Sequence, residues 1–221
     1  MKAAHLEGCA LTGEQDCSGK RESRDERRVA IARAARQLIV EKGLEGLRTR
    51  DIAHRVGINI ATLHYHVPTK EALITLVAES LRAEFREQGM RQDRRGKTAL
   101  GLLRLEFDDF REIMQEMPEL VIVMTELLER SRRDKTIADI ISPLLDYWRK
   151  QFVDIFSLGV TDGSFRSNLD PLSAAFIATG AMIDCWRQWT SYSAQVEPML
   201  AELERCFTPL PRVSQHNVSQ G

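Results

Sequence analysis

At 221 residues the chain is long enough to bury a sizeable core in one large domain or two small ones. Its formal net charge of −1 argues against a uniformly basic nucleic-acid coat protein. The charge is uneven, because residues 20–73 hold 12 Lys and Arg against 7 Asp and Glu, whereas the rest of the chain holds 19 against 25. A basic N-terminal third on an acidic body is typical of a DNA-contacting head on a ligand-binding trunk, although the ordinary solvated charge of helices would give the same count.

The first predicted helix follows an N-terminal arm. Residues 1–22 show no hydrophobic periodicity and are expected to be disordered. Ser23 and Glu26 fit a capping box that opens a helix, and apolar residues then recur at helical spacing. Gly43 is expected to end this helix.

Two short helices are predicted next. Thr49 is expected to cap the first, which runs to Val56. Gly57 ends it where a left-handed residue is wanted. Asn59 is expected to cap the second, roughly Ile60 to His66.

The rest of the chain also reads as helix. Pro68 stops the second short helix, and Thr69 caps a longer one from Lys70 to about Gln88. A polar, basic link follows at Gly89 to Gly96. Beyond it lie apolar stripes at helical spacing, and no convincing strand-like alternation occurs. The sequence therefore predicts an all-α fold, a helix-turn-helix head on a helical-bundle trunk.

Two prolines are expected to mark a kink or a helix boundary within the trunk. Pro143 should kink or restart the helix in which it lies. Asp170 followed by Pro171 is a cap with proline at the first helical position, and it opens a helix ending near Trp189. The predicted divisions are a disordered arm over 1–22, a DNA-binding domain with its connecting helix over 23–88, a ligand-binding and dimerisation domain over 89–210, and a flexible tail over 211–221.

The two short helices that meet at Gly57 have the length and punctuation of a helix-turn-helix. In that motif the second helix enters the major groove of DNA, where amide, hydroxyl and imidazole groups meet base edges. Lys70 begins the next helix, where its ammonium and the free N–H groups can hold a phosphate. The side chains expected to face the groove are Asn59, Ile60, Ala61, Thr62, His64 and Tyr65.

The stretch RTRDIAHRVGINIATLHYHVPTKEAL resembles the DNA-binding head of the tetracycline-repressor (TetR) family. The resemblance covers about residues 24–75 and implies a dimeric repressor whose trunk binds a small molecule. His64 stands where the family usually has tyrosine, and Val67 where phenylalanine is common. By resemblance the DNA-contacting positions are Thr49, Arg50, Thr62, Tyr65, His66 and Lys70.

His64 and His66 raise a metal-binding alternative, which the helical spacing disfavours. Residues two apart on a helix point about 200° apart, whereas ligands on one face are three or four apart. No metal and no cofactor are therefore expected. Purely structural roles remain the alternatives for these side chains. His66 could be bonded to the backbone, Tyr65 could serve packing, and Lys70 could be a solvated lysine.

The trunk is rich in aromatic and methionine side chains, which are core residues by default and also the usual lining of ligand pockets. A cavity for a small hydrophobic effector is expected where three predicted helices converge. Its predicted lining is Phe107, Phe110, Met114, Trp148, Phe152 and Met182. The polar residues considered for the same cavity, each of which could equally face solvent, are Glu106, Asp109, Glu126, Asp184 and Cys185.

A homodimer is expected through the predicted helices at about 171–189 and 195–207. The first carries small residues at Ala174, Ala178 and Ala181, which allow close helix packing. Packing within one subunit is the alternative use of the same face.

Nothing in the sequence suggests catalysis, because no nucleophile elbow, phosphate-binding glycine loop or zinc-protease helix is present. The four cysteines are scattered and form no disulfide framework, no signal-peptide pattern begins the sequence, and the longest apolar run is Leu120 to Met124. We therefore expect a cytoplasmic, non-enzymatic transcriptional regulator, most consistent with a repressor released from a palindromic DNA operator by its effector. A helical adaptor without DNA binding is the other class considered.

Overall fold

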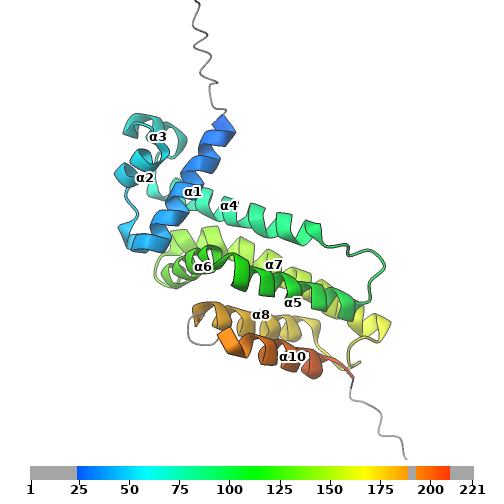
Figure 1. Ribbon diagram of the computed structural model, residues 1–221. Helices are drawn as coiled ribbons and strands as arrows, with labels where there is room; N and C mark the ends of the chain where they lie inside the picture. The colour runs from blue at the N-terminus through cyan, green and yellow to red at the C-terminus, as the bar shows by residue number, and fades with distance from the viewer. Residues whose placement is uncertain (1–23, 189–192, 210–221) are drawn as a thin grey trace, which may run out of the picture.

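The computed structural model describes residues 24–188 and 193–209, where all regular structure is helical, as predicted. The α-helices of the head lie together at one end of the molecule: α1 (Arg24–Lys42), α2 (Thr49–Val56) and α3 (Ile60–His66). The long α4 (Lys70–Arg91) leaves the head and runs along the trunk (Figure 1). The trunk holds α5 (Ala99–Glu116), α6 (Pro118–Ser131), α7 (Lys135–Asp162), α8 (Pro171–Arg187) and α10 (Val196–Phe207). Short 3₁₀ turns occur at Leu44–Gly46 and Ser193–Gln195.

The turn between α2 and α3 has the geometry that its residues predict. Gly57 is left-handed, with φ 72° and ψ 32°, a conformation that glycine adopts without a Cβ penalty. Asn59 caps α3, since its side-chain oxygen accepts a hydrogen bond from Thr62 N at 2.7 Å. Thr69 caps α4 in the same way, accepting from Ala72 N at 3.1 Å.

The predicted cap of α2 is wrong by one residue. Thr49 is already helical, and the N-cap is Arg48, whose backbone is extended and whose side chain makes no capping bond. A hydroxyl beside a helix start favours a cap, but the backbone angle decides which residue has that position. The capping box predicted at Ser23 and the arm at 1–22 lie outside the described residues.

Helix α4 is longer than its expected end near Gln88. It continues through Gly89 to Arg91, and its C-cap is Gln92, whose backbone is extended. The basic link therefore begins at Gln92.

Helix α7 runs without a break through Pro143, so the proline does not restart it. Pro143 is exposed, so the carbonyl that loses its helical hydrogen bond to the proline can be accessible to solvent. Further along α7, Gly159 leaves room for the Phe165 ring, because a Cβ at this glycine would lie 1.9 Å from that ring. Phe165 packs against Phe156, which also meets Phe207 of α10 at a ring-centroid distance of 4.6 Å.

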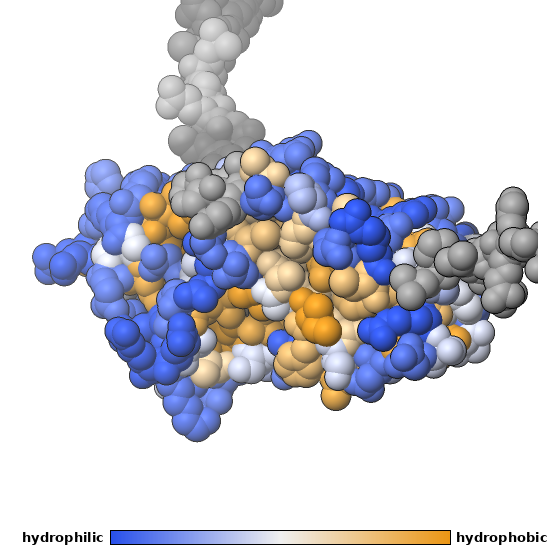
Figure 2. All heavy atoms as spheres, turned by 90° about the horizontal axis from the view of Figure 1, so that it is seen from below, coloured by the Kyte–Doolittle hydropathy of each residue, from blue (hydrophilic) through white to orange (hydrophobic). Residues whose placement is uncertain are grey.

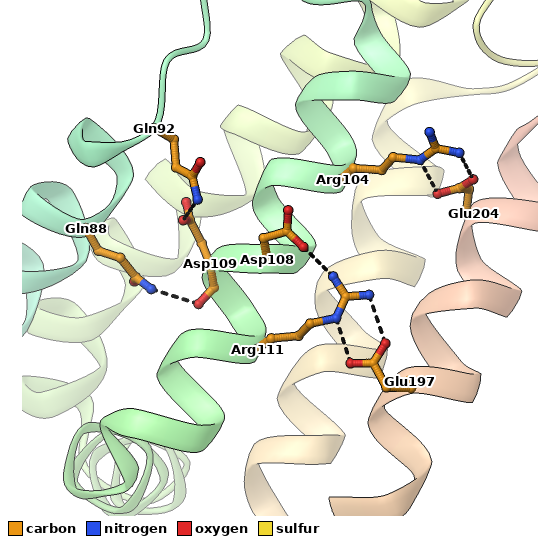
Figure 3. A network of polar contacts seen from close by, with 8 residues as sticks. All are labelled: Gln88, Gln92, Arg104, Asp108, Asp109, Arg111, Glu197 and Glu204. Carbon is orange, nitrogen blue, oxygen red and sulfur yellow. Dashed lines mark hydrogen bonds and ion pairs between the residues drawn. The ribbon is translucent and has the colours of Figure 1, made fainter.

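The lowest layer of the trunk in Figure 1 is the pair α8 and α10, beneath α5, α6 and α7. Helix α10 is clamped to α5 by two bidentate ion pairs, Arg104–Glu204 and Arg111–Glu197, which Figure 3 shows side by side. Over 24–188 and 193–209, no helix is both long and apolar enough to cross a membrane.

Candidate functional sites

The outer face of α3 presents most of the predicted groove-facing side chains to solvent. Leu63 and Val67 are buried and anchor this helix in the head. Tyr65 is 72% exposed although it is a large aromatic, a position that packing alone does not explain. The other predicted side chains divide by exposure: Asn59, Ile60, Ala61 and His64 are exposed, whereas Thr62 and His66 are half-buried.

Two further predicted positions lie at neighbouring helix starts. Arg50 is exposed and Thr49 half-buried in the first turn of α2, and Lys70 is the exposed first residue of α4. Arg48, exposed at the N-cap of α2, belongs to the same surface and was not predicted, because sequence reasoning placed the cap at Thr49. These helix starts also offer free backbone N–H groups.

Ion pairing divides the cations of the head into two groups. Several are neutralised: Lys42 pairs with Asp51 at 2.7 Å, Arg55 forms two bonds to Glu41 at 2.8 Å, and Arg28 and Arg36 pair with residues of α4. Arg48, Arg50 and Lys70 form no salt bridge within the described residues. Arg48, Arg50 and Lys70, which lie near α3, are therefore among the head cations that no carboxylate pairs in the described residues.

His66 is half-buried at the end of α3. Its Nδ1 is buried without a partner in the described residues, its carbonyl accepts from Arg28 at 3.4 Å, and its ring meets Tyr65 edge to face at 5.3 Å. Burial, with smaller contributions from the nearby arginines of α1, lowers the pKa of His66 and favours the neutral ring. No three His, Cys, Asp or Glu side chains of the described chain gather as a metal site.

A cavity of about 390 Å³ lies among α4, α5, α6, α7 and α8. Of its predicted lining, Phe110, Trp148 and Met182 are in the wall. The structure places Phe107, Met114 and Phe152 in the core instead, at 2%, 2% and 0% exposure, and away from the lining. Helical spacing identified the inward side of each helix but not which of its residues border the open space.

The second half of α4 contributes a wall that sequence reasoning missed. Arg82, Phe85, Arg86 and Gly89 line the cavity at spacings of three and four, so the helical period was the available signal. It went unused because α4 was assigned to the head alone.

Stacked aromatic rings form the opposite side of the cavity. Trp148 of α7 and Trp186 of α8 stack with centroids 5.2 Å apart and planes 17° apart. Phe110 of α5 stacks on Trp186 at 6.0 Å. The three rings come from three helices and bring a flat, apolar surface to the cavity.

Two buried carboxylates complete the wall on α5. Arg94 pairs with Glu106 at 2.5 Å and with Asp109 at 3.2 Å. Figure 3 shows Gln88 and Gln92 pointing at Asp109 from the α4 side. Burial raises the pKa of Glu106 and of Asp109, and the Arg94 guanidinium opposes that shift in each.

The other polar residues considered for the cavity lie elsewhere. Glu126 accepts a hydrogen bond from Leu44 N at 3.2 Å and so joins α6 to the head. Asp184 lies in a separate, smaller hollow with Gln188. Cys185 is outside the lining, and burial raises the pKa of its thiol, which disfavours the reactive thiolate.

Helix α4 connects the α3 surface to the cavity. One side of α4 is tied to α1 by Arg36–Glu84 and Arg28–Glu79, and the Arg36 side chain is only 8% exposed. Arg82, Phe85 and Arg86 of the same helix line the cavity within two residues of Glu84. Helix α4 therefore joins the wall of the cavity to α1 of the head.

The small-residue face of α8 packs inside the subunit. Ala174 and Ala178 are fully buried, so the alternative of packing within one subunit describes this face. The opposite face of α8 carries Leu172, Phe176 and Ile177, each more than half exposed. Figure 2, which views the molecule from the side of α8 and α10, shows apolar residues gathered across the middle of that surface with hydrophilic residues around them.

Comparisons with known proteins agree with this architecture. Residues 31–77 match the family described as bacterial regulatory proteins, tetR family. The chain is 29% identical over 145 residues to the HTH-type transcriptional repressor KstR2 of Mycolicibacterium smegmatis, a match covering 65% of this chain and 70% of that protein.

Two solved structures share the fold at 20% identity. One is a putative transcriptional regulator from Saccharomonospora viridis in complex with choline, with a TM-score of 0.72 over 82% of this chain and 95% of that one. The other is the transcriptional regulator FadR from Bacillus subtilis in complex with stearoyl-CoA, with a TM-score of 0.69 over 79% and 96%.

Proposed function

Because the chain belongs to the tetR family of bacterial transcriptional regulators, a family of regulators rather than enzymes, we propose that it is a repressor. As a homodimer it binds a palindromic DNA operator in the cytoplasm, and a small hydrophobic effector in the trunk cavity releases it. The observation that carries this proposal is α4, which holds the α3 surface at one end and lines the cavity at the other.

The DNA-contacting surface in this proposal is the outer face of α3 with the two helix starts beside it. His64, Thr62 and Asn59 read base edges, and Ile60 and Ala61 offer apolar contacts to thymine methyl groups. Because Asn59 Oδ1 already accepts from Thr62 N, its amide nitrogen is the group left for a base. Arg50, Tyr65 and Lys70 contact the phosphates of the DNA backbone, and Thr49 and His66 lie beside them. These contacts position the head on the DNA.

The dimer in this proposal forms through α8 and α10. A recognition helix of seven residues reads only a few base pairs, so two heads must act together. The exposed apolar side chains of α8 supply a surface that a second copy would cover. Sedimentation should show a dimer at micromolar concentration, and Phe176→Glu should shift it to monomer while leaving the helix content unchanged.

Release follows from linkage between the two sites. Two heads on DNA need a fixed spacing between half-sites, so a ligand that favours another position of α4 lowers operator affinity. A coupling of about 1–3 kcal/mol, usual for allostery, would weaken operator binding roughly 5- to 150-fold. The aromatic and aliphatic lining favours a hydrophobic effector, and the choline and stearoyl-CoA bound to similar proteins show that this fold accepts small molecules.

The decisive experiment is selection of bound sequences from random DNA by the purified full-length protein. We expect a palindrome, whose symmetry reports the dimer. A double variant, Tyr65→Ala with Lys70→Ala, should lose this DNA while keeping its thermal unfolding midpoint, whereas Lys135→Ala, an exposed trunk lysine, serves as the control and should retain it. Recovery of no enriched sequence, or retention of binding by the double variant, would contradict the proposal.

A further inference from the structure

The α5 wall of the cavity carries unbalanced negative charge. Glu106 and Asp109 are 6% and 8% exposed, and a buried carboxylate is costly unless a cation or several donors hold it. Within the described residues both pair with a single guanidinium, that of Arg94. Two carboxylates against one arginine leave one negative charge in a wall that contacts the open space.

The rings opposite this wall attract positive charge as well. The face of an aromatic ring carries the negative part of its quadrupole and attracts ammonium groups. Trp186 stacks on both Trp148 and Phe110, so the faces left for a cation are those of the two outer rings.

The lining also contains two charged side chains that are exposed to solvent. Arg82 and Arg86 are exposed on α4, and Arg82 lies over the Tyr147 ring at 5.6 Å. They make the formal charge of the lining +1, three arginines against two acids. Water and salt screen an exposed charge far more than a buried one, so the buried carboxylates dominate the field inside the cavity.

We propose that the cavity binds an organic cation with an apolar or aromatic body, such as a quaternary ammonium compound, and that its charge lies between the Glu106–Asp109 pair and the stacked tryptophans. The inference rests on the proposed function, because it names the chemical class of the effector. A cavity of about 390 Å³ has room for a small molecule of this kind.

Arg94 connects this binding to α4. It lies three residues beyond the end of α4, and its guanidinium holds the same two carboxylates that the ligand cation would approach. The ligand therefore competes with Arg94, and displacing Arg94 loosens the segment that fixes the C-terminal end of α4 to α5.

Three probes of one shape test the charge preference: phenyltrimethylammonium, the uncharged tert-butylbenzene and the anion benzenesulfonate. Each has a phenyl ring with one tetrahedral group, and none changes charge near neutral pH. Calorimetric titration of the full-length protein should show the cation binding about tenfold or more tightly than tert-butylbenzene, a preference within the range of desolvated cation–π and charge interactions. Benzenesulfonate should bind most weakly.

Variants on α5 locate the preference. Glu106→Gln with Asp109→Asn should reduce the preference for the cation over tert-butylbenzene to the part that the aromatic rings supply. Asp108→Asn, the same charge change next to Asp109 but at an exposed residue paired with Arg111, should keep the preference. Arg94→Gln should raise the affinity for the cation, because the internal competitor is removed, and this arm remains decisive if the double variant fails to fold.

Equal affinity for the cation and tert-butylbenzene, or no binding of the cation, overturns the inference. Tightest binding of benzenesulfonate also overturns it, and would transfer the ligand's charged group to Arg82 and Arg86. DNA binding separates this test from the proposed function: if the cation binds as expected but leaves the affinity for the selected DNA unchanged, the release proposal fails and the ligand class stands.

Discussion

The α3 surface and the trunk cavity are built in opposite ways. His64 and Tyr65 of α3 are exposed, and the start of the helix is set by a hydrogen bond between residues three apart in the chain, Thr62 N to Asn59. The cavity gathers side chains from five helices, and its two carboxylates are buried together with the Phe110 and Trp186 rings. We therefore expect substitutions on the α3 surface to change DNA binding without changing stability. Substitutions in the trunk should change both ligand binding and stability.

Two aromatic residues give the largest test of that contrast. Phe156→Ala removes a fully buried ring that joins α7 to α10 and should cost about 3–5 kcal/mol of unfolding free energy. Tyr65→Ala removes an exposed ring and should change stability by less than about 0.5 kcal/mol while weakening DNA binding. Urea unfolding compares the two, and a similar loss from both would break the contrast.

At the ion pair that joins α4 to α1, one substitution should change both the stability and the response of DNA binding to a ligand. Glu84→Gln leaves the Arg36 guanidinium buried without its carboxylate, which should cost about 2–3 kcal/mol, below the usual figure for a buried pair because Glu84 is a third exposed. It should also weaken the effect of a ligand on DNA binding. Lys150→Gln, from an exposed pair on α7, is the control and should cost less than about 0.5 kcal/mol.

His64 tests whether the head reads sequence. If it contacts a base, His64→Ala should change relative affinities among operator variants by roughly 1–3 kcal/mol without changing stability. Binding assays on single-base variants of the selected DNA measure this. A uniform loss across all variants would reassign His64 to the backbone.

Lys70 should behave in the complementary way. Lys70→Ala should weaken all DNA similarly and lower the slope of log affinity against log salt by about one unit for each Lys70 in the complex. Titrations at several salt concentrations give the slope. A sequence-dependent loss would show instead that Lys70 contacts bases.

The smallest expected effect is a pH dependence that belongs to the trunk. Burial raises the pKa of Glu106 above its ordinary value of 4.5, so over the window between the two values the folded protein holds a proton that the unfolded chain has released. The stability that the protonated Glu106 contributes is fully present below pH 4.5. It is lost as the pH rises through the raised pKa that Glu106 has in the folded protein. The unfolding free energy of wild type should therefore fall relative to Glu106→Gln across that window. An unchanged difference would show that Arg94 cancels the effect of burial.

The sequence was informative about the head because its signals are local. Gly57, Asn59 and Thr69 act on atoms within three or four residues, so the bounds of α3 and the start of α4 follow from their chemistry. The cap placed at Thr49 in place of Arg48 was wrong because the backbone angle of a single residue decides that position. The match to the tetR family over residues 31–77 covers this same region.

What the sequence by itself determined is the all-α class, the head and the inward faces of the trunk helices. Tertiary structure alone decided that Phe110, Trp148 and Met182 border the cavity while Phe107, Met114 and Phe152 fill the core. It also decided that the small residues of α8 pack inside the subunit, and that Arg94 meets Glu106 and Asp109. The physical reason is that helical periodicity specifies a direction around each helix axis, whereas a cavity depends on how five helices meet, which no one helix encodes.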